Sequence, residues 1–271
     1  MEHVIVLVMP AIDPAELPAL TINFEYGDTD DHTCVKGPLD LYKQFTAPNK
    51  TYEGYGFLEV NVSVLLIPDD IERDWWGSPD SYWMRQKVRR AIKLGYSFAA
   101  FDHNEYIDDI HEINISLDVR QGRPMTESYR TRPTEQSPFG DQPCPRHRHD
   151  YFGVFKDGKL FAYALVPQCG EMMLFSRILG HGDRMSDGIM NLLVYEAVKH
   201  RHENSNTRYA VYFLHNSGTT GLQFFKRKMG FGGYTVRWEL ARPGVVVPSQ
   251  ASSRLRGVKE WWRGRFARSP S

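Results

Sequence analysis

Residues 151–166 read YFGVFKDGKLFAYALV, two apolar stretches that meet at Asp157-Gly158. An Asp-Gly pair between such stretches predicts a β-hairpin, because both central residues of its tight turn need a positive φ. A second turn near residues 168–170 leads to MMLFSRI at 172–178, which has the composition of a third strand. The sequence therefore predicts three meandering strands at the centre of the fold.

The residues after these strands predict helix, strand, helix and strand. The first helix is expected to be capped by Ser186 or Asp187 and to run to about His202, with its apolar face at Ile189, Leu192, Leu193 and Ala197. The apolar patterns that follow predict a buried strand at 209–214, a helix at 221–229 and a final strand at 234–240.

The residues before the hairpin show weaker patterns. Alternation predicts strands at 4–9, within 56–68 and at 97–102, and helical spacing predicts helices at 78–95 and 105–116. Residues 120–145 are expected to form a loop that holds at most one short helix. We therefore divide the chain into an N-terminal extension (1–75), a main domain (76–242) and a tail (243–271).

Composition excludes several classes of protein. The 33 basic and 33 acidic side chains cancel, so no global charge selects nucleic acid or membrane, and 41% hydrophobic residues are enough for a packed core. Cys34, Cys144 and Cys169 are odd in number and widely spaced, which fits a reducing compartment rather than a disulfide framework. We expect a cytoplasmic protein.

The C-terminal half carries a resemblance to a known family. Asn216 at a strand end, and a helix that closes in Lys228-Met229-Gly230-Phe231, are similar to the last part of the GNAT superfamily of N-acetyltransferases. The order of elements over 97–240 resembles it too. The resemblance implies an α/β fold with a mixed, mostly antiparallel central sheet flanked by helices, whose central strands splay apart to admit an acyl-CoA thioester.

The same resemblance implies a loop that binds the CoA diphosphate. Arg177, Gly180 and Gly182 match the family's spacing of a basic or amide residue and two small residues. Small residues allow backbone amides and the next helix N-terminus to approach a diphosphate closely. Arg184 to Gly188 form an alternative cradle, and a tight turn that needs glycine is the explanation without a ligand.

The final helix departs from the family in one respect. Lys226 stands where many GNAT enzymes have a catalytic tyrosine, and GLQFFK at 221–226 is similar to the Phe-Lys element of the Fem-type peptidoglycan aminoacyltransferases. Those enzymes share the GNAT fold and take the acyl group from aminoacyl-tRNA, and LLVYEA at 192–197 is similar to them as well. Lys226 either stabilises negative charge or belongs, with its two basic neighbours, to a solvated helix end.

Acyl transfer to an amine needs a neutral amine, a stabilised oxyanion and a proton for the leaving group. Glu171, at the start of the third strand, is a candidate base. His215 and Asn216, at the end of a strand, are candidates for orienting the substrate or a water, and His181 could do the same or bind phosphate. Each of these residues also has an ordinary structural alternative at a strand end or turn.

Two pairs of polar residues are candidates for the acceptor pocket. Asp102 and His103 end a strand where GNAT-like folds bind acceptors, although they could merely cap the next helix. His147 and His149 precede the hairpin. Cys144 with these two histidines makes a poor zinc pattern, so no metal is expected.

The tail is basic and aromatic. Its acidic residue Glu260 is outnumbered by the basic residues Arg254, Arg256, Lys259, Arg263, Arg265 and Arg268, and its aromatic residues are Trp261, Trp262 and Phe266. Such a segment can lie on the anionic inner membrane surface, can contact RNA phosphates, or can be an inert tail. Between the two contacts we favour peripheral membrane contact, and we expect no specific nucleic acid partner.

The function expected from the resemblance is acyl-CoA-dependent N-acyl transfer, most simply of acetyl from acetyl-CoA to a primary amine of a small molecule or sugar precursor. A Fem-like ligase that uses aminoacyl-tRNA is one alternative. A GNAT-like binding domain without catalysis is the other.

Overall fold

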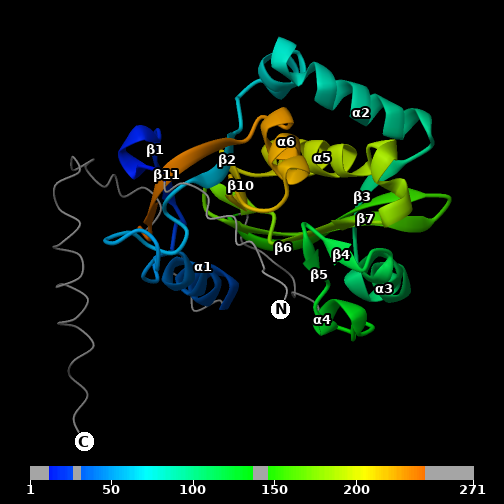
Figure 1. Cartoon of the computed structure of the whole chain (residues 1–271), viewed down its shortest axis with the longest axis horizontal. Coiled ribbons are helices and arrows are strands. Elements are labelled where there is room, and N and C mark those ends of the chain that lie inside the picture. The colour runs from blue at the N-terminus through cyan, green and yellow to red at the C-terminus, as the bar shows by residue number, and fades with distance from the viewer. Residues whose placement is uncertain (1–11, 27–31, 137–145, 242–271) are drawn as a thin grey trace, which may run out of the picture.

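The computed structural model describes residues 12–26, 32–136 and 146–241. They form one large mixed sheet with helices on both faces (Figure 1). The strand order is β1-β11-β2-β10-β8-β7-β6-β3, with β9 also paired to β7. The described strands pair antiparallel except for β1 with β11 and β8 with β10. The expected α/β class with a mostly antiparallel sheet is confirmed.

The strands of the main sheet are β1 (Ala19–Asn23), β2 (Val62–Leu66), β3 (Ser97–Phe101), β6 (His147–Lys156), β7 (Lys159–Cys169), β8 (Met172–Leu174), β9 (Arg177–Gly180), β10 (Tyr209–Leu214) and β11 (Gly232–Glu239). A separate small hairpin consists of β4 (Val119–Arg120) and β5 (Arg123–Pro124). The helices are α1 (His32–Phe45), α2 (Tyr82–Lys93), α3 (Ile107–Ile115), α4 (Glu127–Arg130), α5 (Ile189–Asn204) and α6 (Thr220–Lys228).

The hairpin of β6 and β7 confirms the sequence signal that predicted it. Asp157 and Gly158 have φ values of 50° and 78°, and the residues on either side of them, Lys156 and Lys159, are paired. Strain-free positive φ at the glycine explains why Asp-Gly is found at this turn.

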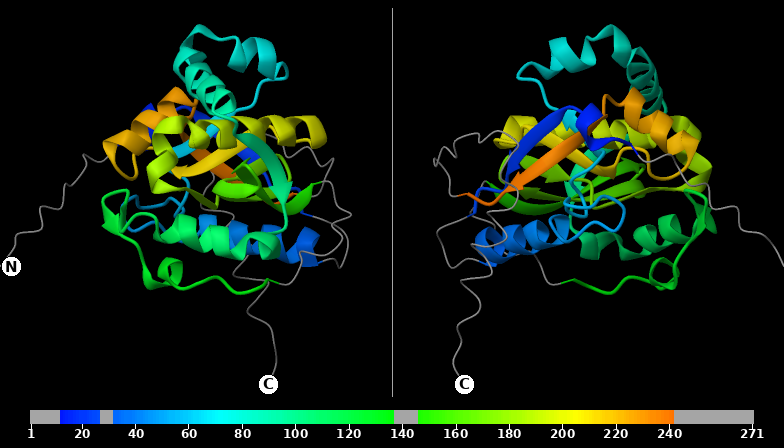
Figure 2. Two further views of the ribbon diagram at one scale, coloured as in Figure 1. Left: turned by 90° about the vertical axis from the view of Figure 1, so that its right-hand side faces the viewer. Right: turned by 60° about the vertical axis from the view of Figure 1, so that its left-hand side comes forward.

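The helices cover the sheet in two layers (Figure 2). Helices α2, α5 and α6 lie on one face, and α1, α3 and α4 lie on the other. Helix α5 packs against both the sheet and α2, which explains its nearly continuous apolar sequence. Its buried residues include Leu192, Leu193, Val194 and Val198.

The expected boundary at residue 76 does not divide the structure. Strand β2 lies inside the sheet between β10 and β11, and β1 pairs with β11 in parallel. Phe24 stacks on Trp238 with ring centroids 5.3 Å apart, and Phe45 lies 4.9 Å from the same ring. Residues before 76 therefore complete the core.

Several predicted bounds are corrected. The strand expected at 172–178 is broken at 175–176 into β8 and β9, and the strand within 56–68 spans only β2. The loop expected at 120–145 contains part of the β4–β5 hairpin and α4. Neither Ser186 nor Asp187 caps α5: a 3-10 turn covers Gly182–Asp187, and Gly188 is the N-cap residue, with no side chain to bond the helix.

Three predictions concern residues outside the described ranges: the strand at 4–9, Cys144 and the basic aromatic tail. Within the described ranges, none of the helices combines the length and the apolar character that a membrane span requires.

Candidate functional site

Strands β8 and β10 run side by side and then separate. Parallel pairing joins Met172–Leu174 to Tyr209–Val211, and the amide of Phe175 donates to Val211 O at 3.0 Å. Beyond this point β9 follows β7, whereas β10 continues along β2 after a register shift. This separation is the splay that the resemblance implied.

Aromatic side chains fill the gap between the separated strands. Phe175, Tyr212 and Phe231 are buried, with ring centroids 5.8 to 6.4 Å apart. Burial raises the pKa of Tyr212, so its phenol keeps its proton at neutral pH. Buried aromatic rings, one of them a neutral phenol, therefore pack together where the two strands separate.

Lys226 of α6 is buried against this aromatic group, with 1% of the residue exposed. Its Nζ donates to Leu214 O at 2.6 Å and to Ser217 Oγ at 3.4 Å, and lies 4.9 Å from the centroid of the Tyr212 ring. Burial lowers the pKa of Lys226 to about 8. The solvated-helix-end interpretation is wrong for Lys226, although its two basic neighbours are exposed.

The Gly-Phe pair after α6 positions this lysine. Gly230 has a φ of 91° and its amide donates to Arg227 O at 3.0 Å, while the Phe231 amide donates to Lys226 O at 3.0 Å. These two bonds form a Schellman motif, whose left-handed residue is most often glycine because glycine has no Cβ. The motif on which the resemblance rests is therefore the helix cap that places Lys226 beside β10.

His215 and Asn216 follow β10 directly, in the same region as Lys226. The His215 Nδ1 atom lies 3.4 Å from Oγ of Ser63, a buried residue of β2. Burial, and then the charge of Lys226, lower the pKa of His215, which favours a neutral ring at pH 7. Three of the four expected catalytic residues are thus brought together.

The parallel strands β8 and β10 separate, and helices α5 and α6, which follow β9 and β10 along the chain, lie on the same face of the sheet. The fold is GNAT-like.

Solved structures with similar architecture include FemX, at 13% identity, a TM-score of 0.49, and coverage of 78% of this chain and 68% of that chain. L-PGS from Bacillus licheniformis matches at 13% identity and a TM-score of 0.43, over 64% of this chain and 59% of that one. A tandem GNAT protein from the clavulanic acid biosynthesis pathway matches at 15% identity and a TM-score of 0.38, over 80% of this chain and 59% of that one. This chain therefore spans less than two thirds of two of these proteins.

No protein-family model and no curated protein sequence matches the chain. The likeness to solved structures concerns the GNAT-like fold alone.

Glu171 lies at the other end of β10 from Lys226. Its Oε1 is 3.3 Å from Arg208 Nη1, and its Oε2 accepts a bond from the Asn23 amide at 3.1 Å. Six residues of β10 separate the two ends, which is about 17 Å at the usual rise of a strand. The structure does not support Glu171 as the base of a centre that contains Lys226.

The glycines of the expected diphosphate loop face other parts of the protein. A Cβ atom added at Gly182 would lie 2.6 Å from Leu117 Cγ, and one at Gly188 would lie 2.3 Å from Lys87 O. A Cβ at Gly180 would similarly meet a methionine sulfur of α5 at 2.5 Å. Close packing therefore accounts for the lack of a side chain at these three positions, and Gly188 also has a positive φ.

Side chains also occupy the start of α5, where a diphosphate would lie. Asp187 accepts a hydrogen bond from the Tyr96 hydroxyl at 2.9 Å and lies 3.9 Å from Arg90. A phosphate placed there would be repelled by this carboxylate. His181 caps the 3-10 turn before the helix, because its Nδ1 accepts from the Asp183 amide at 3.3 Å.

The two basic residues expected at this loop contact aromatic rings. The guanidinium carbon of Arg184 lies 5.9 Å from the centroid of Phe161, and that of Arg177 lies 5.5 Å from the centroid of Tyr129. Arg177 therefore faces α4 rather than the start of α5.

Gly188→Ala is expected to lower the free energy of unfolding by about 3 kcal/mol. The alanine must adopt a φ of 91° and also meet Lys87 O, so left-handed strain and a backbone clash add together. Gly158→Ala is the matched control, because Gly158 has a φ of 78° and nothing within 4 Å of an added Cβ. Gly158→Ala should lower the free energy of unfolding by only about 1 kcal/mol. Equal losses in urea denaturation would show that Gly188 is not held against α2.

Asp102 and His103, two of the four residues expected in the acceptor pocket, directly follow β3, a strand at one edge of the sheet. Asp102 caps the 3-10 turn that precedes α3, since its Oδ1 accepts from the Asn104 amide at 2.9 Å. His103 is buried, with its ring centroid 5.0 Å from that of Tyr151.

His147 and His149 begin β6, whose first residue is paired with Cys169 at the Glu171 end of the sheet. The Nε2 atom of His147 lies 2.9 Å from Phe24 O, and burial lowers the pKa of His149. The structure therefore does not bring either histidine to Lys226. In the part of the chain that the structure describes, no three His, Cys, Asp or Glu side chains form a potential metal site.

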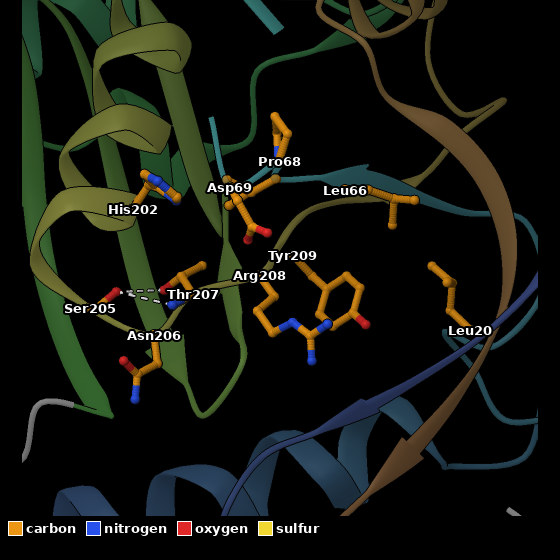
Figure 3. Close-up of a pocket in the computed structure, with 11 residues that line it drawn as sticks. Leu20, Leu66, Pro68, Asp69, His202, Ser205, Asn206, Thr207, Arg208 and Tyr209 are labelled. Atoms are coloured by element: carbon orange, nitrogen blue, oxygen red, sulfur yellow. Dashed lines mark hydrogen bonds between the residues drawn. The ribbon is translucent and has the colours of Figure 1, made fainter. Parts of the chain in front are cut away.

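A groove of about 550 Å³ opens at the start of β10 (Figure 3). Its lining includes Asp69, His202, Arg208 and Tyr209. Arg208 is paired with Glu171, and the two hydroxyls in its wall, Ser205 and Thr207, bond each other at 2.8 Å. The groove is at the opposite end of β10 from Lys226 and is not part of that centre.

Sequence reasoning missed Tyr212 and Ser217 as neighbours of Lys226. Tyr212 lies within an apolar strand sequence, where an aromatic residue predicts only burial. Ser217 follows Asn216, and serine at a strand end is ordinary turn chemistry. Only the three-dimensional return of α6 onto the end of β10 brings them to the lysine.

Proposed function

We propose that the protein is an acyltransferase that forms an amide bond at the centre of Lys226, His215 and Asn216. The observation that carries this proposal is the buried Lys226 ammonium at the mouth of the splayed strands, with a pKa lowered to about 8. An ammonium has three N–H donors, and described residues accept from two of them. The proposal assigns the third to a reacting carbonyl oxygen.

The residues have separate roles in the proposed reaction. The neutral amine of the acceptor attacks the acyl carbon, and the negative charge that forms on the carbonyl oxygen is stabilised by Lys226. His215, neutral at pH 7 because its pKa is lowered, accepts the proton that the attacking nitrogen loses. The tetrahedral intermediate then collapses, the bond to the leaving group breaks, and that group takes a proton.

The leaving group decides how much acid catalysis is needed. A thiolate leaves with little help, whereas the hydroxyl of an ester leaves far more readily when it is protonated. An ammonium with a pKa near 8 is mostly protonated at pH 7 and still acidic enough to give up that proton. Lys226 therefore suits an ester donor.

The covered glycine loop favours the same class of donor. Close packing accounts for Gly182 and Gly188 without a bound diphosphate, and the Asp187 carboxylate stands beside the start of α5. We therefore favour an aminoacyl ester, such as aminoacyl-tRNA, as the acyl donor. The sequence alone had favoured acyl-CoA. This choice replaces the expectation that no nucleic acid is bound.

Binding measurements on the full chain test the choice of donor. Aminoacyl-tRNA should bind more tightly than the same tRNA without its amino acid, and a panel of acyl-CoAs should leave the melting temperature unchanged. A rise in melting temperature with an acyl-CoA, together with equal affinity for charged and uncharged tRNA, would identify acyl-CoA as the donor. Binding of neither class would support the non-catalytic alternative.

The rate of transfer is expected to fall as pH rises through about 8. The lysine stabilises the oxyanion only as the ammonium, and its lowered pKa places deprotonation near that pH. Lys226→Arg keeps its charge at every working pH. This variant should therefore transfer more slowly, but its rate should not fall as pH rises through 8. A rate that instead rises through pH 8 in the native chain would make neutral Lys226 a general base.

A further inference from the structure

The β4–β5 hairpin places two arginines directly opposite each other. Arg120 and Arg123 are cross-strand partners on either side of the two-residue turn Gln121-Gly122, whose φ values are 53° and 76°. Like charges in this relation destabilise a hairpin. An anion bound between the two guanidinium groups would reverse that effect.

Arg120 is held by uncharged groups. Its Nη1 donates to Gly180 O at 2.9 Å, and its Nη2 donates to Ile113 O at 2.7 Å and to Ser116 Oγ at 2.9 Å. Its Nε is buried without a hydrogen-bond partner. Over residues 12–26, 32–136 and 146–241, no carboxylate forms an ion pair with Arg120 or Arg123.

A third arginine approaches from the sheet. Arg177 lies over the ring of Tyr129, which belongs to the short helix that follows the hairpin. Arg177 begins β9, and Gly180, the last residue of the same strand, accepts the bond from Arg120. Arg177 also has no ion pair among the described residues. Two nearby arginines differ, because Arg130 and Arg132 are paired with Asp118 and Asp108.

The hairpin turn reaches the loop that precedes α6. A Cβ on Gly218 would lie 3.5 Å from Gln121 Oε1, and a Cβ on Gly122 would lie 3.7 Å from Thr219 Cγ2. The next residue towards β10, Ser217, accepts the bond from Lys226. A substrate that extends from Lys226 across this loop can therefore reach the arginines.

We propose that Arg120, Arg123 and Arg177 bind a phosphate or diphosphate group of a substrate that reacts at Lys226. This inference rests on the proposed function and adds the chemical class of one substrate. A doubly charged phosphate balances several guanidinium groups, which a single carboxylate does less well. Arg123 and Arg177 can offer it paired N–H bonds, whereas Arg120, whose Nη atoms already donate to protein oxygens, contributes its charge. The phosphate belongs either to the donor or to the acceptor.

Calorimetric titration of the full chain with inorganic pyrophosphate at low salt tests the site. Arg123→Gln and Arg177→Gln should each weaken binding about ten- to a hundredfold, the range for one charge-assisted contact. Arg132→Gln removes the same charge from a guanidinium that Asp108 holds at 2.6 Å, and should leave binding unchanged. If Arg120→Gln does not fold, the two other variants still decide the result, because Arg123 is exposed.

Competition identifies the substrate that carries the phosphate. If aminoacyl-tRNA or CoA displaces pyrophosphate, and Arg123→Gln removes the competition, the group belongs to the donor. If donor and pyrophosphate bind together, it belongs to the acceptor. Lys226→Met should still bind pyrophosphate, so failure of the transfer reaction is distinguishable from failure of this site. No pyrophosphate binding, or equal affinity in Arg123→Gln, Arg177→Gln and Arg132→Gln, would overturn the inference.

Discussion

Replacing Lys226 by methionine is expected to lower kcat and kcat/KM together by about 10² to 10³. The substitution removes the charge that stabilises the oxyanion and keeps most of the side-chain volume. Because Lys226 is buried and its pKa is lowered by burial, methionine also removes a desolvation cost, so the protein should remain folded. Steady-state kinetics on the identified donor and acceptor, with a melting curve for each variant, measures both effects.

Lys228→Met is the matched control, because Lys228 is exposed on the same helix. Its kinetics should be close to those of the native chain, since removal of an exposed surface lysine has little effect. If Lys226→Met changed KM alone, the lysine would be holding a substrate phosphate. Native kinetics in Lys226→Met would exclude it from the reaction.

The sequence predicted the C-terminal half of the fold well because its signals are local. Asp157-Gly158 determines its own turn, and Gly230-Phe231 determines the cap of α6. The residues up to about 54 were predicted poorly for a physical reason, whereas the strands and helices predicted between 56 and 116 are present. Strand β1 is only partly buried, and α1 contains Gly37 and Pro38, which weaken any helical signal. Their structure depends on distant partners such as Trp238.

The candidate site was predicted where it depends on one strand end and one helix, and missed where it depends on the whole sheet. His215, Asn216 and Lys226 lie within twelve positions of one another in the sequence, and they also meet in the structure. Glu171 and His147 were grouped with them on the strength of strand order, which does not specify which end of the sheet each residue occupies. Pairing of His147 with Cys169 assigns both to the other end.

Arg201 is another residue whose role the sequence alone does not reveal. Its substitution is the second change for which we expect a large effect. In the sequence it is one more basic residue near a helix end, yet it is 1% exposed. Its Nη2 lies 2.5 Å from Asp150 Oδ2 and 2.9 Å from Val166 O, and its guanidinium carbon lies 5.3 Å from the centroid of Phe152. It joins α5 to β6 and β7.

Arg201→Met is expected to lower the free energy of unfolding by about 3 kcal/mol, since the carboxylate of Asp150 loses its buried partner beneath the helix and, among the described residues, keeps only Arg148, whose Nε lies 3.5 Å from Oδ2. We place the value at the low end for a buried pair because the Asp150 side chain is 21% exposed and can be partly solvated. Urea denaturation with a constant m-value would measure it. Arg208→Met is the control, because its guanidinium is 68% exposed in its pair with Glu171 and should contribute less than about 1 kcal/mol.

A double variant separates the charge from the packing. If the loss in Arg201→Met comes from the weaker pairing of the Asp150 carboxylate, adding Asp150→Asn should recover most of it, because the amide can remain buried at a lower cost than the charge. If the loss comes from the contacts with Phe152 and Val166, the second substitution should recover nothing. Equal stability of Arg201→Met and Arg208→Met would contradict both explanations and would mean that α5 is held to the sheet by its apolar face alone.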